Sequence, residues 1–283
     1  MEVITLNVGQ GHLAVVRHAG HAIIVDAHVP ANHPDYEFVA EALSQVLSGS
    51  DGSFYVDGLI LTGLDKDHAH AKGVARVLYT YHPDWVMYPK YYKDTENATE
   101  TFQTVDRYRT ARKPSLERIP IRLDVLSSRQ FYNNTFALEM FSPHKDDLDS
   151  SNNGSIVARV TKRDNSYGSF LITGDTELGR WEMIHRLFSR SLNSTILQAA
   201  HHGSDNGAHL KSVYAIQPHT VHISAGDNRQ YNHPHAGAVA IYQNATPNVF
   251  CTQSGTIHTT IGSDWFGRPT VSTRFTQFSR NRR

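Results

Sequence analysis

The sequence predicts an α/β protein in which two β-rich halves lie between outer helices, as a layered α/β/β/α sandwich. Short apolar strands alternate with amphipathic helices in the first part of the chain, and the same alternation returns after residue 136. No fixed-period repeat, low-complexity segment or Pro/Gly/Ser-rich linker interrupts the sequence. We therefore expect one continuous domain over residues 1–283.

The first half opens with strands and then alternates helix and strand. Residues 3–8 alternate apolar and polar side chains and end in the turn Gly9-Gln10-Gly11. Strands are expected at 3–8, 12–17, 21–25, 59–62 and 85–88, and helices at 35–47 and 74–79. The segment from about 90 to 118 is the least regular part, rich in Lys, Arg, Tyr and Thr. It predicts an insertion with one exposed helix over 99–112.

The second half repeats this pattern with strands that are apolar and end at polar motifs. Strands are expected at 136–141, 155–161, 169–173, 194–199 and 221–224, helices at 178–188 and 236–243, and terminal strands from 248 and 255. Strands buried on both faces and covered by helices are what a layered sandwich requires.

Composition narrows the class of protein. With 39% hydrophobic and 19% charged residues the chain can bury a sizeable core, which excludes a disordered or fibrous protein. No apolar run reaches the length of about 18 residues that a membrane helix needs, and the start has no basic leader, so we expect a cytoplasmic protein without membrane insertion. Equal numbers of basic and acidic residues, 27 each, give no overall field that would attract nucleic acid.

Cysteine and histidine usage restricts the metal chemistry. The single cysteine, Cys251, excludes an internal disulfide and any zinc site built on several thiolates. Any metal must therefore be held by His, Asp and Glu. The 18 histidines exceed ordinary surface and core use and require an explanation.

The densest group of potential ligands is the segment 63–70, which reads GLDKDHAH and directly follows the apolar strand expected at 59–62. Two carboxylates, Asp65 and Asp67, are followed at once by His68, and such mixed oxygen and nitrogen donors suit a divalent metal. On its own, a D-x-D-H tetrapeptide is more often a solvated polar turn. Further motifs have to decide between these two interpretations.

Three further strands end in residues of the same type. Gly174-Asp175 follows the strand at 169–173, the tetrapeptide 201–204 (HHGS) follows the strand at 194–199, and the polar segment 226–235 follows the strand at 221–224. Strand ends gathered at one sheet edge are where α/β enzymes place their sites. The four motifs together favour a metal site over a solvated turn.

The order of these motifs resembles that of the metallo-β-lactamase-fold domain of ComEC-type competence proteins. Seven motifs occur in the same order over nearly the whole chain: NVGQG, VDAH, DKDH, NNGS, TGD, HHGS and NHPH. The resemblance implies an αββα metallo-β-lactamase sandwich. It also implies a hydrolase, because the ComEC-like branch is associated with nuclease or phosphodiesterase activity and the phosphorylcholine esterases have a similar framework.

Carried over residue by residue, the resemblance assigns a deeper metal site. Its ligands would be Asp67, His68, the bridging Asp175 and one histidine of the pair at 201–202, for which we expect His201. Asp67 or Asp175 would also orient the attacking water, and His202 would protonate the leaving alkoxide.

The companion metal site departs from the family pattern. Gly63 and Ser142 stand where the family has histidines, which leaves only Asp65 and the bridging aspartate. Neither glycine nor a neutral serine replaces an imidazole ligand, so we expect about one divalent metal per chain, Zn or Mn. A second metal would need His70 or His144 to supply the missing nitrogen.

The remaining motif residues are expected around the metal. Asp26, at the end of a buried strand, is expected to brace the metal loop by hydrogen bonds without being a ligand. The loop at 228–235 is interpreted as a substrate contact for phosphate oxygens, or alternatively as a rigid proline-containing turn. Its contact residues would be Asn228, Tyr231, His233 and His235.

Two functions are therefore predicted. The first is a metal-dependent phosphoester hydrolase, a nuclease or phosphodiesterase, that acts on nucleic acid or a nucleotide through a metal-activated water. The alternative is a degenerate metal-binding module that recognises a nucleotide, or a partner protein from a separate chain, without hydrolysis. Gly63 and Ser142 motivate the alternative.

Overall fold

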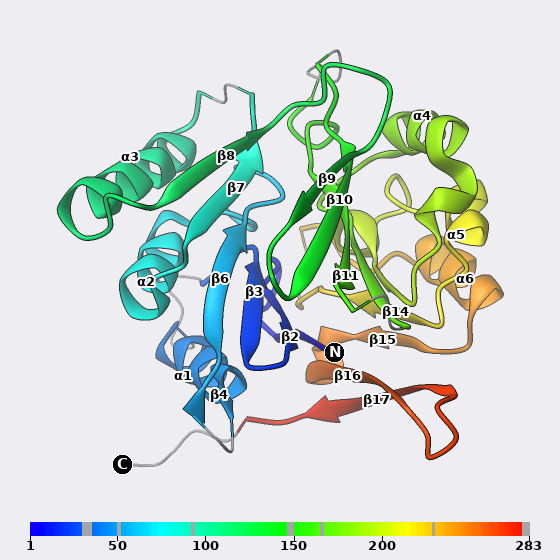
Figure 1. Ribbon diagram of the computed structural model, residues 1–283. Helices are drawn as coiled ribbons and strands as arrows, with labels where there is room; N and C mark the ends of the chain where they lie inside the picture. Colours follow the sequence, from blue (N-terminus) through cyan, green and yellow to red (C-terminus); the bar gives the residue numbers. More distant parts are fainter. Residues whose placement is uncertain are drawn as a thin grey trace.

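Two β-sheets pack face to face between two groups of helices, which gives the four layers predicted from the sequence (Figure 1). This architecture is seen in a computed structural model that describes residues 1–29, 36–49, 52–91, 94–145, 150–164, 167–227 and 230–278. Most strands of the first sheet come from the N-terminal half of the chain, and most strands of the second come from the C-terminal half.

The first sheet has eight strands in the order β17-β16-β1-β2-β3-β6-β7-β8. Its strands are β1 (Glu2–Thr5), β2 (Ala14–His18), β3 (His21–Val25), β6 (Tyr55–Ile60), β7 (Trp85–Pro89), β8 (Glu117–Ile121), β16 (Thr256–Ser263) and β17 (Pro269–Thr276). Strands β1 to β3 form an antiparallel meander, and β3, β6, β7 and β8 run parallel. A two-stranded ribbon of β4 (Ser48–Gly49) and β5 (Gly52–Ser53) lies apart from this sheet.

The second sheet has seven strands in the order β15-β14-β13-β12-β11-β10-β9. Its strands are β9 (Arg129–Tyr132), β10 (Phe136–Ser142), β11 (Val157–Lys162), β12 (Ser169–Ile172), β13 (Ile196–Gln198), β14 (Thr220–Ile223) and β15 (Val249–Cys251). Strands β12 to β15 run parallel, so their carboxyl ends reach the same edge.

Helices cover the outer face of each sheet (Figure 1). The first sheet is covered by α1 (Tyr36–Leu47), α2 (Ala71–Tyr81) and α3 (Glu96–Ala111), and the second by α4 (Leu178–Phe188), α5 (Leu210–Ile216) and α6 (Ala236–Ala245). Short 3₁₀ turns are η1 (Ser189–Leu192), η2 (Ala200–Gly203) and η3 (Thr252–Ser254). No helix in the described ranges combines the length and the apolar character needed to cross a membrane.

The inner strands β2, β3 and β6 of the first sheet are largely buried on both faces because they lie between a helical layer and the other sheet. On β3, Ile24 packs among the helices, whereas Ile23 and Val25 face the second sheet. This explains why β3 is a continuous apolar run with no polar alternation. Polar contacts also cross between the sheets: the ring of His222 lies between the hydroxyls of Thr5 and Thr259, at 2.9 and 2.7 Å.

The segment expected as an insertion forms α3 and β8. Thr95 caps α3 by accepting a hydrogen bond from the amide of Ala98, and the helix is exposed on one side only, because Thr101, Val105 and Tyr108 are buried. The expectation of an exposed helix was therefore too simple. The strands β8, β9 and β17 and the helix α5 were not predicted, since the seven residues of α5 are too few to show helical periodicity.

The predicted motif loops meet where the two sheets share an edge. Backbone hydrogen bonds tie them together: the amide of Ala27 donates to the carbonyl of His68 at 2.7 Å, and that of His201 to Gly174 at 3.0 Å. The amide of Ile156, before β11, donates across the sheets to the carbonyl of Thr62 at 2.8 Å. The site is therefore built on backbone contacts between strand ends.

Candidate metal centre

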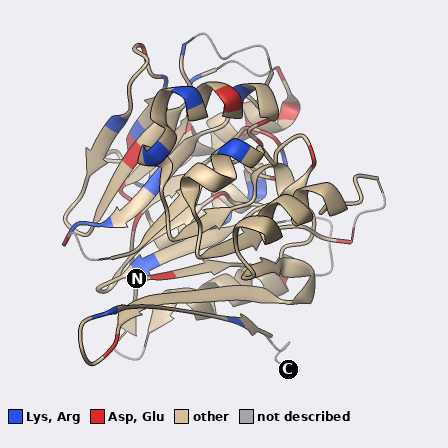
Figure 2. Ribbon diagram, turned by 90° about the vertical axis from the view of Figure 1, so that its right-hand side faces the viewer, with Lys and Arg blue, Asp and Glu red and all other residues tan. Residues whose placement is uncertain are grey.

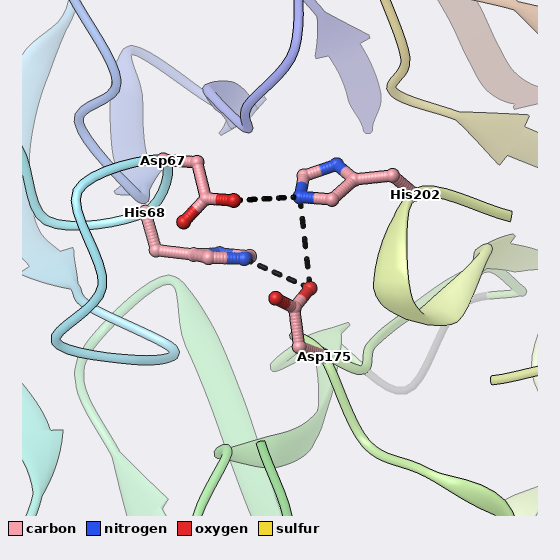
Figure 3. A group of neighbouring side chains, drawn as sticks. All are labelled: Asp67, His68, Asp175 and His202. Atoms are coloured by element: carbon pink, nitrogen blue, oxygen red, sulfur yellow. Dashed lines mark ion pairs between the residues drawn. The ribbon is translucent and has the colours of Figure 1, made fainter. Parts of the chain in front are cut away.

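Four side chains from three loops converge at this edge (Figure 3). They are Asp67, His68, Asp175 and His202, and one ligand atom from each lies within 4.8 Å of all the others. Nε2 of His68 is 2.9 Å from Oδ1 of Asp175, and Nε2 of His202 is 3.4 Å from Oδ2 of Asp67 and 3.7 Å from Oδ1 of Asp175. Two imidazole nitrogens and two carboxylates thus face one point.

The ring of His68 is oriented by Asp26. Nδ1 of His68 lies 2.8 Å from Oδ2 of Asp26 and 3.0 Å from Oγ1 of Thr62. The Asp26 carboxylate also accepts hydrogen bonds from the amide and hydroxyl of Thr62 and contacts Nδ1 of His12 at 2.9 Å. A carboxylate acceptor at Nδ1 keeps the proton on that nitrogen and leaves the lone pair of Nε2 directed at the cluster.

The ring of His202 is oriented by the backbone. Its Nδ1 donates to the carbonyl oxygen of Ser224 at 2.8 Å, which again leaves the Nε2 lone pair for the cluster. The turn that presents it is unusual, since His201, His202 and Gly203 all have positive φ, at 49°, 55° and 78°. A residue with a Cβ costs about 1–2 kcal/mol in this region, so the turn is held by its surroundings.

The donor set fits a divalent cation. Nε2 of His68, Nε2 of His202 and Oδ1 of Asp175 are buried, and outside the cluster itself they have no hydrogen-bond partner among the described residues. Buried polar atoms without a partner are costly, and a metal ion would satisfy all three at once. Mixed imidazole and carboxylate ligands suit Zn, Mn or Fe.

The electrostatics keep both carboxylates charged. Burial opposes ionisation, but the imidazoles of His202 and His68 hold the pKa of Asp67 well below its ordinary value, and they lower that of Asp175 in the same way. Burial likewise opposes protonation of the histidines, yet Asp175 and Asp26 raise the pKa of His68 well above its ordinary value. Asp175 and Asp67 raise the pKa of His202. Both shifts favour protonation of these imidazoles, so protons compete with a metal for the same nitrogens.

His201, the expected ligand, lies beside the cluster. Its side chain is 21% exposed, its Nδ1 is 3.7 Å from Oε1 of Glu177, and it is not one of the four converging residues. The structure brings His202 to that position because the left-handed turn directs the second histidine inward. His201 lines the pocket in front of the cluster.

That pocket has a volume of about 530 Å³ and opens over the four-residue cluster. Asp65, the exposed Lys66, Tyr231 and His233 line it in front of the cluster. The rings of Tyr231 and His233 stack with centroids 5.8 Å apart. Gln10, His28 and Asn152 complete the wall.

Other predicted residues lie elsewhere. His235 contacts its own loop, through Nε2 to the carbonyl of Tyr231 at 3.0 Å, and does not line the pocket. His70 packs its ring against His28 at 6.2 Å, and His144 contacts the guanidinium of Arg180, so neither joins the four-residue cluster. Asn228 lies outside the described residues.

Sequence reasoning missed the pocket-wall residues Gln10, His28, Lys66 and Asn152 and three residues that support the cluster. His12 holds Asp26, Thr62 contacts both Asp26 and His68, and Ser224 fixes His202. His12 directly follows the glycine-rich turn, and Thr62 and Ser224 stand at ends of predicted strands, which is the only signal they carry.

Comparison with known proteins agrees with the fold. No family model matches the chain. The sequence is 29% identical over 204 residues to ComE operon protein 3 of Bacillus subtilis (strain 168); the match covers 71% of this chain but only 24% of that protein, so the chain spans about a quarter of this relative. This confirms the predicted resemblance to ComEC-type domains.

Solved structures share the architecture at low sequence identity. Igni18, a metallo hydrolase from the archaeon Ignicoccus hospitalis, superposes with a TM-score of 0.50 at 11% identity, over 91% of this chain and 98% of that one. CmlA, a diiron β-hydroxylase from Streptomyces venezuelae, gives a TM-score of 0.50 at 14% identity, over 86% and 50%. The predicted metallo-β-lactamase αββα fold is confirmed.

Proposed function

We propose that this chain is a metal-dependent phosphoester hydrolase that acts on nucleic acid or a nucleotide. The observation that carries the proposal is the way both histidines are held: Nδ1 of His68 and Nδ1 of His202 each bond to a fixed acceptor, and each Nε2 faces Asp67 and Asp175. This arrangement supplies two nitrogen and two oxygen donors to one divalent ion, Zn or Mn. His202 takes the ligand role that we expected for His201.

A divalent metal bound there supplies Lewis acidity for the scissile P–O bond and makes water a stronger nucleophile. The side chain of Asp67 is 33% exposed toward the pocket, so its second oxygen can orient the attacking water and accept its proton. Both ring nitrogens of His202 are engaged in this scheme. His201, the neighbouring imidazole on the pocket wall, is therefore assigned as the donor to the leaving alkoxide.

The pocket supports a phosphate-bearing substrate. The ammonium of Lys66, the amides of Gln10 and Asn152 and the hydroxyl of Tyr231 are groups that bind phosphate oxygens. The volume lies within the range of about 300–1,000 Å³ that is usual for small-ligand sites. Tyr231, which is exposed, also offers a ring on which a nucleobase can stack.

The test is turnover after metal reconstitution. Protein stripped with a chelator would be incubated with bis-(p-nitrophenyl) phosphate, single- and double-stranded DNA, RNA and cyclic nucleotides under Zn, Mn and Mg. We expect turnover that Asp175→Asn abolishes, whereas Asp124→Asn, a change at an exposed aspartate away from the pocket, retains it. Metal binding without turnover of any substrate would favour the non-hydrolytic binding module.

A further inference from the structure

A second groove lies in the outer helical layer, between α4 with its following turn η1 on one side and α5 on the other (Figure 2 views this layer from outside). Its volume is about 750 Å³. One wall carries His185, Arg190 and Asn193, and the other carries Lys211, Tyr214 and Gln217. It shares no lining residue with the metal pocket, so a ligand here would be separate from the proposed reaction.

The charge of the groove is one-sided. Arg190 and Lys211 stand on opposite walls, and no described residue of the lining is Asp or Glu. Within the described ranges neither cation forms an ion pair, and Glu182, the one acidic residue of α4, lies outside the lining. Two cations that face one groove without a counter-charge repel each other, and an anion bound between them relieves that repulsion.

The walls are also prepared for directed hydrogen bonds. Nδ1 of His185 is buried and has no hydrogen-bond partner among the described residues, which is unusual for a polar atom. Nδ2 of Asn193 donates to the carbonyl of Ile216 at 3.0 Å and so fixes the η1 wall against α5. A pre-arranged site loses less entropy on binding than a mobile surface would.

An apolar platform adjoins the cations. Leu210 and Tyr214 are one helical turn apart on α5, and both line the groove with 45% and 51% of their surface exposed. Exposed rings beside cations stack flat bases in nucleic-acid-binding proteins. The groove therefore combines an anion site with a site for a flat ring.

We propose that this groove binds the phosphomonoester of a nucleotide, with the phosphate between Arg190 and Lys211 and the base on Tyr214. Such a group has two sources, a free nucleoside monophosphate or the 5′-phosphorylated end of a nucleic-acid strand. The proposal does not depend on hydrolysis at the metal centre.

The experiment is calorimetric titration of the full chain, without metal and with EDTA, using 5′-AMP, inorganic phosphate and adenosine. We expect one site for 5′-AMP with an affinity at least about 10-fold above that for phosphate or adenosine, since both parts contribute. Replacing both cations, Arg190→Ala with Lys211→Ala, should weaken 5′-AMP binding by about 30-fold or more, and Tyr214→Ala by about 10-fold. Arg186→Ala, at an exposed arginine of α4 outside the lining, is the matched control and should change nothing.

Two results would overturn the proposal. One is 5′-AMP binding that survives in the double variant, which would locate the nucleotide elsewhere, for example in the metal pocket. The other is that the unmodified, correctly folded chain does not bind 5′-AMP at millimolar concentration. A 10-nucleotide oligothymidylate with and without a 5′-phosphate separates the sources: preference for the phosphorylated strand supports strand-end recognition, and binding of 5′-AMP alone supports a free nucleotide. Should the double variant misfold, the single variant Lys211→Glu takes its place. Normal 5′-AMP binding by that variant has the same meaning as survival in the double variant: the groove is not the site.

Discussion

Replacing His202 by alanine should remove the metal, whereas the same change at His201 should not. The two residues are adjacent, share the left-handed turn and differ in what their rings face. His202 directs Nε2 at Asp67 and Asp175, and His201 lies near Glu177. Both variants lose an imidazole at a position of similar backbone strain. A difference in metal binding between them therefore reports which imidazole is a ligand.

The magnitude follows from the number of donors. Loss of a residue that only supports a ligand typically weakens metal binding by about 10–100-fold. We therefore expect loss of one of the four direct donors to weaken it by about 100-fold or more. At a free metal concentration of 100 times the Kd, the unmodified protein gains about 2.7 kcal/mol of stability. At that concentration His202→Ala would gain only about 0.4 kcal/mol, and His201→Ala should keep the full gain.

The assay is calorimetric unfolding of both variants and the unmodified chain with and without Zn, together with metal content after gel filtration. We expect a metal-dependent rise in Tm for the unmodified chain and for His201→Ala that is nearly absent in His202→Ala. Metal lost from His201→Ala and kept by His202→Ala would show that the assignment of the pair is reversed. Retention in both variants would exclude the whole turn from the metal site.

Three further predictions concern the surroundings of the site. Asp26→Asn keeps the shape but loses the charge that orients His68, so metal affinity should fall about 10–100-fold in a competition titration; an unchanged Kd would contradict the orienting role. Burial lowers the pKa of His222 to about 3, so as the pH falls the unfolded chain binds a proton at this residue before the folded chain does. Between pH 7 and pH 5 the free energy of unfolding, measured in urea, should therefore fall by about 2 kcal/mol more in the unmodified chain than in His222→Gln. Equal slopes would refute this. Because φ at position 201 is 49°, His201→Gly should be about 1 kcal/mol more stable than His201→Ala; the opposite order would mean that the turn relaxes.

The fold was predictable because its signals are local and repeated. Buried strands such as β3 and β12 are short apolar runs, and each ends in a polar motif that must lie at a sheet edge. The elements that escaped prediction carry weaker signals. Strand β8 reads ERIPI, in which Pro120 and two charged residues suit an edge strand and mask the pattern.

The cluster was predictable in composition but not in which histidine of the pair faces it. Asp67, His68 and Asp175 each follow a strand, so their approximate meeting point could be inferred from topology. The choice between His201 and His202 depends on positive φ angles at three successive residues, 201 to 203. Of these, only Gly203 is a residue type that favours positive φ. The contact from Ser224 that orients the ring joins residues 22 positions apart and has no local signature.

The ligand set also links the chemistry to the packing of the two sheets. Asp67 and His68 follow β6 of the first sheet, whereas Asp175 and His202 follow β12 and β13 of the second. The four donors are therefore brought within reach of one another only when the apolar layer between the sheets has formed. An unfolded chain offers no such preformed set, so the free energy of metal binding adds to the free energy that holds the sheets together. A metal at this site would join the two halves of the sandwich at the edge where the pocket opens.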